Sequence, residues 1–296
     1  MNKIIKSDMY KTQNLKDTWS FDHYDKYKNA ITTWNWACLP FGEYRDCKSM
    51  WSKAPNKTSG SILEIGSAAG GAYDFMNNSG LIDLSDYTGL EISQVGYEYA
   101  KNKFPSANWK QVDVTKYELN QKYDYIFERI AIHHMPDPLS IINRFSKNTN
   151  KAFSTHFVSC LNGDTISELS IARYRHPNGD YVFFDIINVF EVIEILYQNG
   201  FNRISLFHSP LHEKIYHDSL AHQYISPDIN LKKRIVSRCY VFATKSNDDS
   251  PLKIAPVYAK TLIFNRKVIN LVNERIKRMC DKRDGVLYES NYHQIK

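Results

Sequence analysis

A Gly-rich stretch near residue 66 has the residue types and spacing of a nucleotide-binding turn. The apolar run Ile62-Leu-Glu-Ile65 is bounded by Gly on both sides, as expected for a short buried strand that ends in a turn. Gly66 allows the sharp turn, and Gly70 lets the following helix approach without an intervening Cβ. Backbone N–H groups at the start of that helix would face a bound ligand.

Acidic residues follow the next two predicted strands. Glu91 ends the predicted strand 87–92, and Asp113 lies near the end of the predicted strand 107–114. Because the carboxyl ends of parallel strands meet at one edge of a sheet, we expect both acids near the Gly-rich turn.

A third group of candidates follows the predicted strand that starts at Tyr123. The segment reads Phe127-Glu-Arg-Ile-Ala-Ile-His-His-Met-Pro-Asp-Pro138. Its carboxyl and imidazole groups can titrate near neutral pH when the surroundings shift their pKa values, so they are candidates for proton transfer. A buried, hydrogen-bonded structural His is the commoner case. The candidates are Glu128, His133 and His134.

The pattern Glu64-x-Gly66-x-x-x-Gly70, with Glu91 after the second strand, resembles the cofactor motif of class I S-adenosylmethionine-dependent methyltransferases. The resemblance implies S-adenosylmethionine as cofactor, its ribose on Glu91 and its adenine near Asp113. A carboxylate suits a ribose because it accepts two O–H donors at once. The cofactor-binding residues implied in this way are Glu64, Gly66, Ser67, Ala68, Gly70, Glu91, Ile92, Asp113, Val114 and Glu128.

The resemblance extends to the segment after the fourth strand, which is similar to the "His-His-x-x-Asp" loop of small-molecule methyltransferases. It implies that His134 orders the loop or its helix and that His133 or Glu128 acts as general base. The charged pair Glu128-Arg129 departs from many relatives. It marks either acceptor specificity or a salt bridge.

Strands alternate with helices from residue 61 to residue 244, which predicts an α/β fold with a doubly wound, mostly parallel sheet. The resemblance implies seven strands, the last two forming an antiparallel hairpin, in a Rossmann-like methyltransferase fold. Residues 1–58 are rich in Tyr and Trp and predict a helical lid, whereas 246–296 predict a basic extension with a helix over 258–283. Within the α/β region, residues 160–184 are expected to be irregular and 185–198 to form a helix that Asn199-Gly200 ends. The cofactor domain is expected at 59–245.

Composition narrows the class of protein. The 296 residues include 43% hydrophobic and 24% charged residues and carry a net charge of +6, typical of a globular protein with mild affinity for anions. The five Cys are scattered without a C-x-x-C pair, which indicates a reducing, cytoplasmic location. No signal sequence or transmembrane segment is visible. A metal site is not expected, although four His between 208 and 222 allow one.

We therefore predict an S-adenosylmethionine-dependent methyltransferase that acts on a small molecule or glycan, with oxygen as the accepting atom. One alternative is an RNA methyltransferase that holds phosphates on the basic C-terminal helix. Another is a non-catalytic binding protein on a methyltransferase fold. Nothing in the sequence indicates an oligomeric state.

Overall fold

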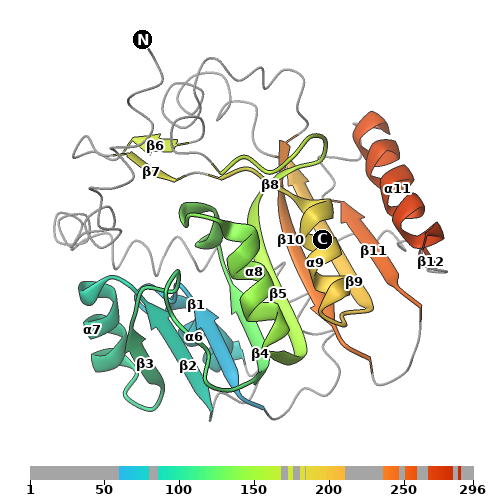
Figure 1. Ribbon diagram of the computed structural model, residues 1–296. Coiled ribbons are helices and arrows are strands. Elements are labelled where there is room, and N and C mark those ends of the chain that lie inside the picture. Colours follow the sequence, from blue (N-terminus) through green and yellow to red (C-terminus); the bar gives the residue numbers. More distant parts are fainter. Residues whose placement is uncertain are drawn as a thin grey trace.

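A computed structural model describes residues 60–79, 86–167, 173–175, 181–183, 185–210, 236–246, 251–258, 266–282 and 286–287. The predicted aromatic lid at 1–58 lies outside these residues. Figure 1 shows a central sheet with helices packed against it.

Ten of the described strands form one sheet, in the order β12-β11-β9-β10-β5-β4-β1-β2-β3, with β8 pairing β5 off this path. All pairs are parallel except those that β10 makes with β5 and β9. The described strands of this sheet are β1 (Ile62–Ile65), β2 (Tyr87–Glu91), β3 (Asn108–Gln111), β4 (Tyr123–Glu128), β5 (Thr149–Cys160), β8 (Ile187–Asn188), β9 (Arg203–Pro210), β10 (Val236–Thr244), β11 (Lys253–Tyr258) and β12 (Val286–Leu287).

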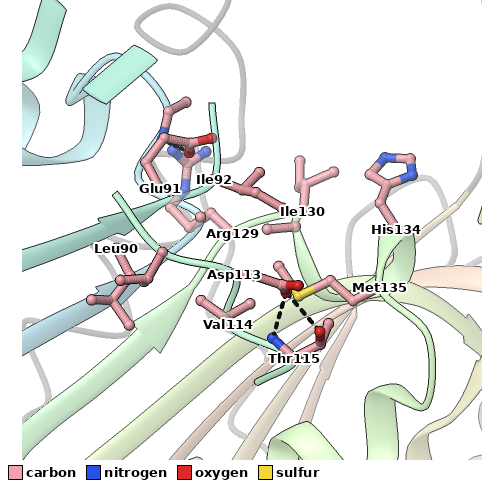
Figure 2. A pocket seen from close by; sticks show the side chains of 14 residues that line it. Leu90, Glu91, Ile92, Asp113, Val114, Thr115, Arg129, Ile130, His134 and Met135 are labelled. Atoms are coloured by element: carbon pink, nitrogen blue, oxygen red, sulfur yellow. Dashed lines mark hydrogen bonds between the residues drawn. The ribbon is translucent and has the colours of Figure 1, made fainter. Parts of the chain in front are cut away.

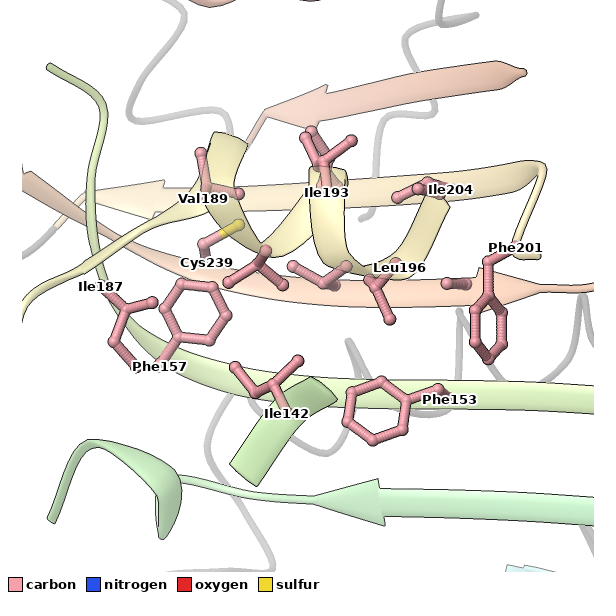
Figure 3. Close-up of a cluster of buried hydrophobic side chains, with 14 of the residues drawn as sticks. Ile142, Phe153, Phe157, Ile187, Val189, Ile193, Leu196, Phe201, Ile204 and Cys239 are labelled. Atoms are coloured by element: carbon pink, nitrogen blue, oxygen red, sulfur yellow. The ribbon is translucent and has the colours of Figure 1, made fainter. Parts of the chain in front are cut away.

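Helices cover both faces, which confirms the predicted doubly wound α/β fold. One apolar cluster packs α8, α9 and α11 onto the sheet, and a second packs α6 and part of α7 onto the opposite face. Figure 3 shows the α9 side chains Val189, Ile193 and Leu196 over strands β5, β9 and β10. The helices are α6 (Gly71–Ser79), α7 (Gln94–Lys103), η1 (Ile132–His134), α8 (Pro138–Lys147), α9 (Val189–Gln198) and α11 (Arg266–Asp281).

The sheet is larger than the seven strands that the resemblance implied. The expected seven are present, and the antiparallel β9–β10 pair is among them. Beyond them β11 pairs in parallel with β9, so the C-terminal segment extends the sheet. Its sequence contains Pro256, which argues against a central strand. In the described part of the chain β12 pairs only with Lys253 and Ile254, so Pro256 lies where β11 is the edge strand.

Two other predicted segments differ from the structure. The helix expected from residue 185 begins at Val189, because Ile187 and Asn188 pair with β5 as β8. The Asn188 side chain then caps the helix by accepting from the N–H of Phe190 at 2.8 Å. The segment 160–184, predicted to be irregular, contains an antiparallel pair, β6 (Arg173–Arg175) and β7 (Tyr181–Phe183).

The helix predicted over 258–283 is confirmed as α11, with Tyr258 belonging to β11 instead. Ile269, Val272 and Ile276 are buried in the cluster that contains α8 and α9. Arg275 donates to the carbonyl of Leu161 at 2.9 Å, and its guanidinium lies 4.5 Å from the centre of the Phe190 ring. Arg275 therefore contributes to the packing of α11 and is not simply an exposed charge. No helix in the described ranges is both long and apolar enough for a membrane span.

Candidate cofactor and active site

A pocket opens at the carboxyl ends of β1, β2, β3 and β4 (Figure 2). This edge of a doubly wound sheet is where ligands bind, because loops and helix N-termini converge there. The ends of these four neighbouring strands and the loops that follow them contribute to it. The lining residues are Gly66, Ala68, Leu90, Glu91, Ile92, Val112, Asp113, Val114, Thr115, Arg129, Ile130, Ala131, His134 and Met135.

The turn after β1 has the conformation that the Gly-rich motif predicts. Gly66 has a φ of 67°, a region that favours glycine. A Cβ on Gly66 would lie 2.5 Å from the Cβ of Ala131, in the loop after β4. The absence of a side chain at 66 therefore lets the β1 turn and the β4 loop meet at the floor of the pocket.

Glu91 at the end of β2 lies beside this turn. Its Oε2 accepts from the N–H of Ala68 at 2.6 Å, and its Oε1 accepts from the N–H of Ser93 at 2.8 Å. Burial raises the pKa of Glu91, while the hydrogen bonds from Ser93 and Ala68 oppose that rise. Each carboxylate oxygen has a second lone pair, so Glu91 can still accept hydroxyl protons from a ligand in the pocket.

Asp113 also lines the pocket, but its carboxylate is engaged by its own turn. Oδ1 accepts from the Thr115 N–H at 3.0 Å and from the Thr115 hydroxyl at 2.6 Å. Oδ2 lies 3.3 Å from Nζ of Lys116. Its neighbours Val112 and Val114 add apolar surface to the pocket. Apolar surface with a few polar groups suits a flat aromatic base such as adenine.

Three predicted cofactor residues lie outside the pocket lining. Glu64 is buried and accepts a hydrogen bond from the hydroxyl of Tyr87, and burial raises its pKa to about 7. Ser67 is buried, and its N–H donates to the carbonyl of Leu90 at 2.9 Å. A Cβ on Gly70 would lie 3.0 Å from the Phe104 and Trp109 rings. These residues hold the turn in place from behind.

Glu128, at the end of β4, also lies outside the lining and is fully buried. Its Oε2 accepts from the N–H groups of Ala131 and Ile132, at 3.0 and 3.2 Å. Its Oε1 accepts from the N–H of His156, at 2.7 Å, and from the Thr155 hydroxyl. The carboxylate thus ties the loop after β4 to the neighbouring strand β5.

That loop contains Ile130 with a φ of 57°. A β-branched residue in this left-handed region is strained, and surrounding contacts must hold it there. The Ile130 N–H donates to the carbonyl of His156 at 3.0 Å. Together with the Glu128 hydrogen bonds, this contact fixes the strained bend whose residues 129–131 line the pocket.

The two His residues are placed differently. His134 is partly exposed and lines the pocket. His133 is buried behind it, with the two ring centres 4.0 Å apart. Burial lowers the pKa of His133 well below its usual value, and the nearby His134 lowers it further. The His133 ring is therefore neutral at neutral pH, and its protonated form is disfavoured.

Sequence reasoning missed several lining residues. It noted Arg129 but assigned it no definite role, and the structure places it in the pocket lining. The Glu128 carboxylate beside it is engaged by the four donors described above. Position in the sequence could have identified the missed residues, since each lies at the end of a strand or in the loop that follows it. The missed lining residues are Leu90, Val112, Thr115, Ile130, Ala131 and Met135.

The His group suggested as a metal site does not gain support. His208 is fully buried in β9, and burial lowers its pKa to about 4. His212, His217 and His222 lie outside the described residues. Within the residues that the structure describes, no three His, Cys, Asp or Glu side chains could hold a metal ion together.

The pocket fits S-adenosylmethionine. Glu91 offers a carboxylate for the ribose hydroxyls, and Val112 and Val114 form an apolar surface for the adenine beside Asp113. At the other end the glycine at 66 leaves backbone exposed to a ligand, because a Cβ there would fill the space next to Ala131.

Comparison with known proteins gives a family. A family model described as "Methyltransferase domain" matches residues 42–206, more than half of the chain. No curated protein matches the sequence. Solved structures with a similar fold include an S-adenosylmethionine-dependent methyltransferase from Mesorhizobium loti, with 13% identity, a TM-score of 0.45, and coverage of 70% of this chain and 100% of that one.

A second similar structure is the magnesium protoporphyrin IX methyltransferase from Synechocystis PCC 6803, which was solved with bound S-adenosylhomocysteine. It shares 11% identity and a TM-score of 0.48, and the match covers 78% of this chain and 98% of that one. The family model carries the assignment. The chain belongs to the methyltransferase-domain family, and it is a class I S-adenosylmethionine-dependent methyltransferase.

Proposed function

We propose that this methyltransferase acts on a small molecule or glycan and transfers the methyl group to oxygen. The observation that carries the proposal is the pair of adjacent imidazoles at the pocket, His134 in its lining and His133 behind it. A hydroxyl must lose its proton as it becomes a methyl ether, and a neutral imidazole can accept that proton.

The cofactor supplies an activated methyl group on a sulfonium. The chain's own residues bind it, orient it and exclude water, which supplies much of the rate enhancement for a displacement of this kind. Glu91 and the turn at Gly66 would hold the ribose and the methionine part. Asp113 would lie near the adenine, as the family resemblance implies. Glu64, Ser67, Gly70 and Glu128 would act by holding the two loops in position.

In this proposal His134, which lines the pocket, receives the proton, and the buried His133 packs against its ring. Glu128 is less suited to that role, because its carboxylate already accepts four hydrogen bonds. The expected consequence is specific. His134→Gln would lower kcat and change its pH profile, while the affinity for S-adenosylmethionine would stay close to wild type.

Calorimetry with S-adenosylmethionine tests the cofactor site. Wild type should bind, and the double variant Gly66→Val with Glu91→Ala should not. Lack of binding by wild type, or undiminished binding by the double variant, would overturn the proposed site. Asn270→Ala provides a matched control, because Asn270 is exposed on α11.

The accepting atom is tested by incubating the purified enzyme with metabolite and glycan extracts. A product heavier by about 14 Da is expected, one methyl group replacing a hydrogen. Its NMR spectrum should contain a methoxy signal. An N-methyl or C-methyl product would contradict transfer to oxygen.

An RNA acceptor is the alternative, supported by exposed basic residues of α11, Lys277 and Arg278, and by Lys282 directly after it. It predicts RNA binding that weakens steeply with salt. Absence of binding at low salt would exclude it.

We also propose a cytoplasmic location, supported by the scattered Cys residues. Fractionation of cells that produce the protein would test it.

A further inference from the structure

Four basic or imidazole side chains lie together beside the cofactor pocket, around the β4, β5 and β10 strands. We call Arg129, His133, His156 and Arg238 the basic cluster. Arg129 follows β4 and lines the cofactor pocket, so the cluster adjoins that pocket directly. His133 adjoins it through His134, which also lines the pocket.

His156 is the centre of the cluster. Its side chain is 5% exposed, and Nδ1 is buried with no hydrogen-bond partner. Its backbone is bonded on both sides of Arg129, because its N–H donates to Glu128 and its carbonyl accepts from Ile130. This pairing fixes Arg129 next to His156.

Arg238 joins the cluster from β10, the strand that pairs with β5 on the side away from β4. In the antiparallel β5–β10 pair, Tyr240 is opposite His156 and Arg238 is opposite Val158. Side chains two residues apart on a strand share a face, so Arg238, Tyr240 and His156 lie on one face of the sheet. The rings of His156 and Tyr240 are 5.9 Å apart at their centres.

Of the four members of the cluster only the two arginines carry charge. The Glu128 carboxylate adjoins the cluster through the hydrogen bond from the His156 N–H, and burial raises the pKa of Glu128. Burial and the nearby guanidinium groups of Arg129 and Arg238 together lower the pKa of His156 to about 3. Burial, His134, His156 and Arg238 together lower the pKa of His133. Both imidazoles are therefore neutral at neutral pH. Glu64 faces Arg129 from β1, and its raised pKa of about 7 leaves much of it protonated near neutral pH.

We propose that the basic cluster binds an anionic group, a carboxylate or a phosphate, of the molecule that accepts the methyl group. This inference rests on the proposed function, since it names the chemistry of the acceptor for the same site. A guanidinium presents paired N–H donors that match the oxygens of these anions. Nδ1 of His156 offers a further buried polar atom that can donate to the anion. Arg129 joins this site to the cofactor pocket, as required for an acceptor that reacts there.

Binding of inorganic phosphate and of acetate tests the proposal. The full chain is saturated with S-adenosylhomocysteine and titrated with each anion, with 15N-histidine NMR as readout. Wild type is expected to show a saturable shift of the His156 resonances, which His156→Gln identifies. Arg129→Gln and Arg238→Gln should each weaken anion binding about tenfold or more, the effect of losing a charge-assisted hydrogen bond. Tighter binding of phosphate would indicate a phosphate ester as acceptor, and tighter binding of acetate a carboxylate.

Controls keep the result interpretable. Arg203→Gln removes an exposed charge at the start of β9 and should leave anion binding unchanged. Arg238→Lys keeps the charge and should retain more binding than Arg238→Gln, so it covers a folding failure of the latter. No saturable binding by wild type, or binding by both Gln variants that is as tight as that of wild type, would overturn the anion site. Calorimetry with S-adenosylmethionine on the same samples tests the cofactor site separately, so failure of the anion site leaves the methyltransferase assignment intact.

Discussion

Glu128 and His156 hold β4 and β5 together at the edge of the cofactor pocket. The Glu128 carboxylate accepts from the N–H of His156 at 2.7 Å, and one residue beyond Arg129 the N–H of Ile130 donates to the His156 carbonyl at 3.0 Å. The two contacts hold the strained bend at Ile130, where φ is 57°. The bend places Arg129 in the pocket lining.

Glu128→Gln should therefore destabilise the protein and weaken the cofactor site together. The amide would replace one acceptor oxygen with an N–H₂ group that faces backbone N–H donors, and an unsatisfied buried donor costs about 1–3 kcal/mol. Urea unfolding and titration with S-adenosylmethionine measure the two effects. Glu98→Gln is the control, because Glu98 is exposed on α7. A fully stable variant with normal cofactor affinity would show that the hydrogen bonds of Glu128 contribute neither to stability nor to the cofactor site.

Gly66→Ala should weaken cofactor binding through its contact with Ala131. The added Cβ would lie 2.5 Å from the Cβ of Ala131 and would occupy a residue with a φ of 67°. Calorimetry should show a large loss of affinity for S-adenosylmethionine. Combining the change with Ala131→Gly removes the clash and leaves only the backbone strain, roughly 1 kcal/mol. Partial recovery in the double variant is the expected result, and no recovery would contradict the clash as the cause.

Asp185 makes stability depend on pH. It is fully buried, and burial raises its pKa from 3.8 to about 8, opposed by a hydrogen bond from Ser167. Between these pH values the unfolded chain ionises Asp185 while the folded chain keeps it protonated. The folded state then binds more protons, so stability falls as pH rises through this range, by at most about 1.4 kcal/mol per pH unit. Below pH 3.8 the group is protonated in both states and contributes no slope.

Asp185→Asn should flatten this dependence. The free energy of unfolding measured from pH 4 to pH 8 should fall less steeply than in wild type, because the neutral amide does not titrate. Glu274→Gln, at an exposed residue of α11, should leave the slope unchanged. An identical slope in wild type and Asp185→Asn would show that Asp185 ionises normally in the folded protein.

The C-terminal helix should behave as part of the core. Ile276 is fully buried, so Ile276→Ala should lower the free energy of unfolding by about 2–5 kcal/mol. Lys277→Ala, at the exposed neighbouring residue, should change it by less than about 0.5 kcal/mol. Thermal or urea unfolding measures both. Equal stability of the two variants would mean that the packing of α11 does not stabilise the folded core.

The local pattern of the chain determined the fold class and the place of the pocket. Apolar runs, glycines at 66 and 70 and the acid at 91 are close in sequence to the elements that they form. Strand order in a doubly wound sheet then brings the strand ends together. For this reason the confirmed methyltransferase family and fold could be inferred before any coordinates.

Long-range contacts decided the rest. The sequence offered Glu128 as a base, but only the packing of β4 against β5 brings its carboxylate within reach of four donors. The pairing of β11 with β9 depends on residues about 50 positions apart, which no local pattern encodes. Likewise Arg129, His156 and Arg238 come from three strands or strand ends, and their chemistry exists only where those strands pair in the sheet.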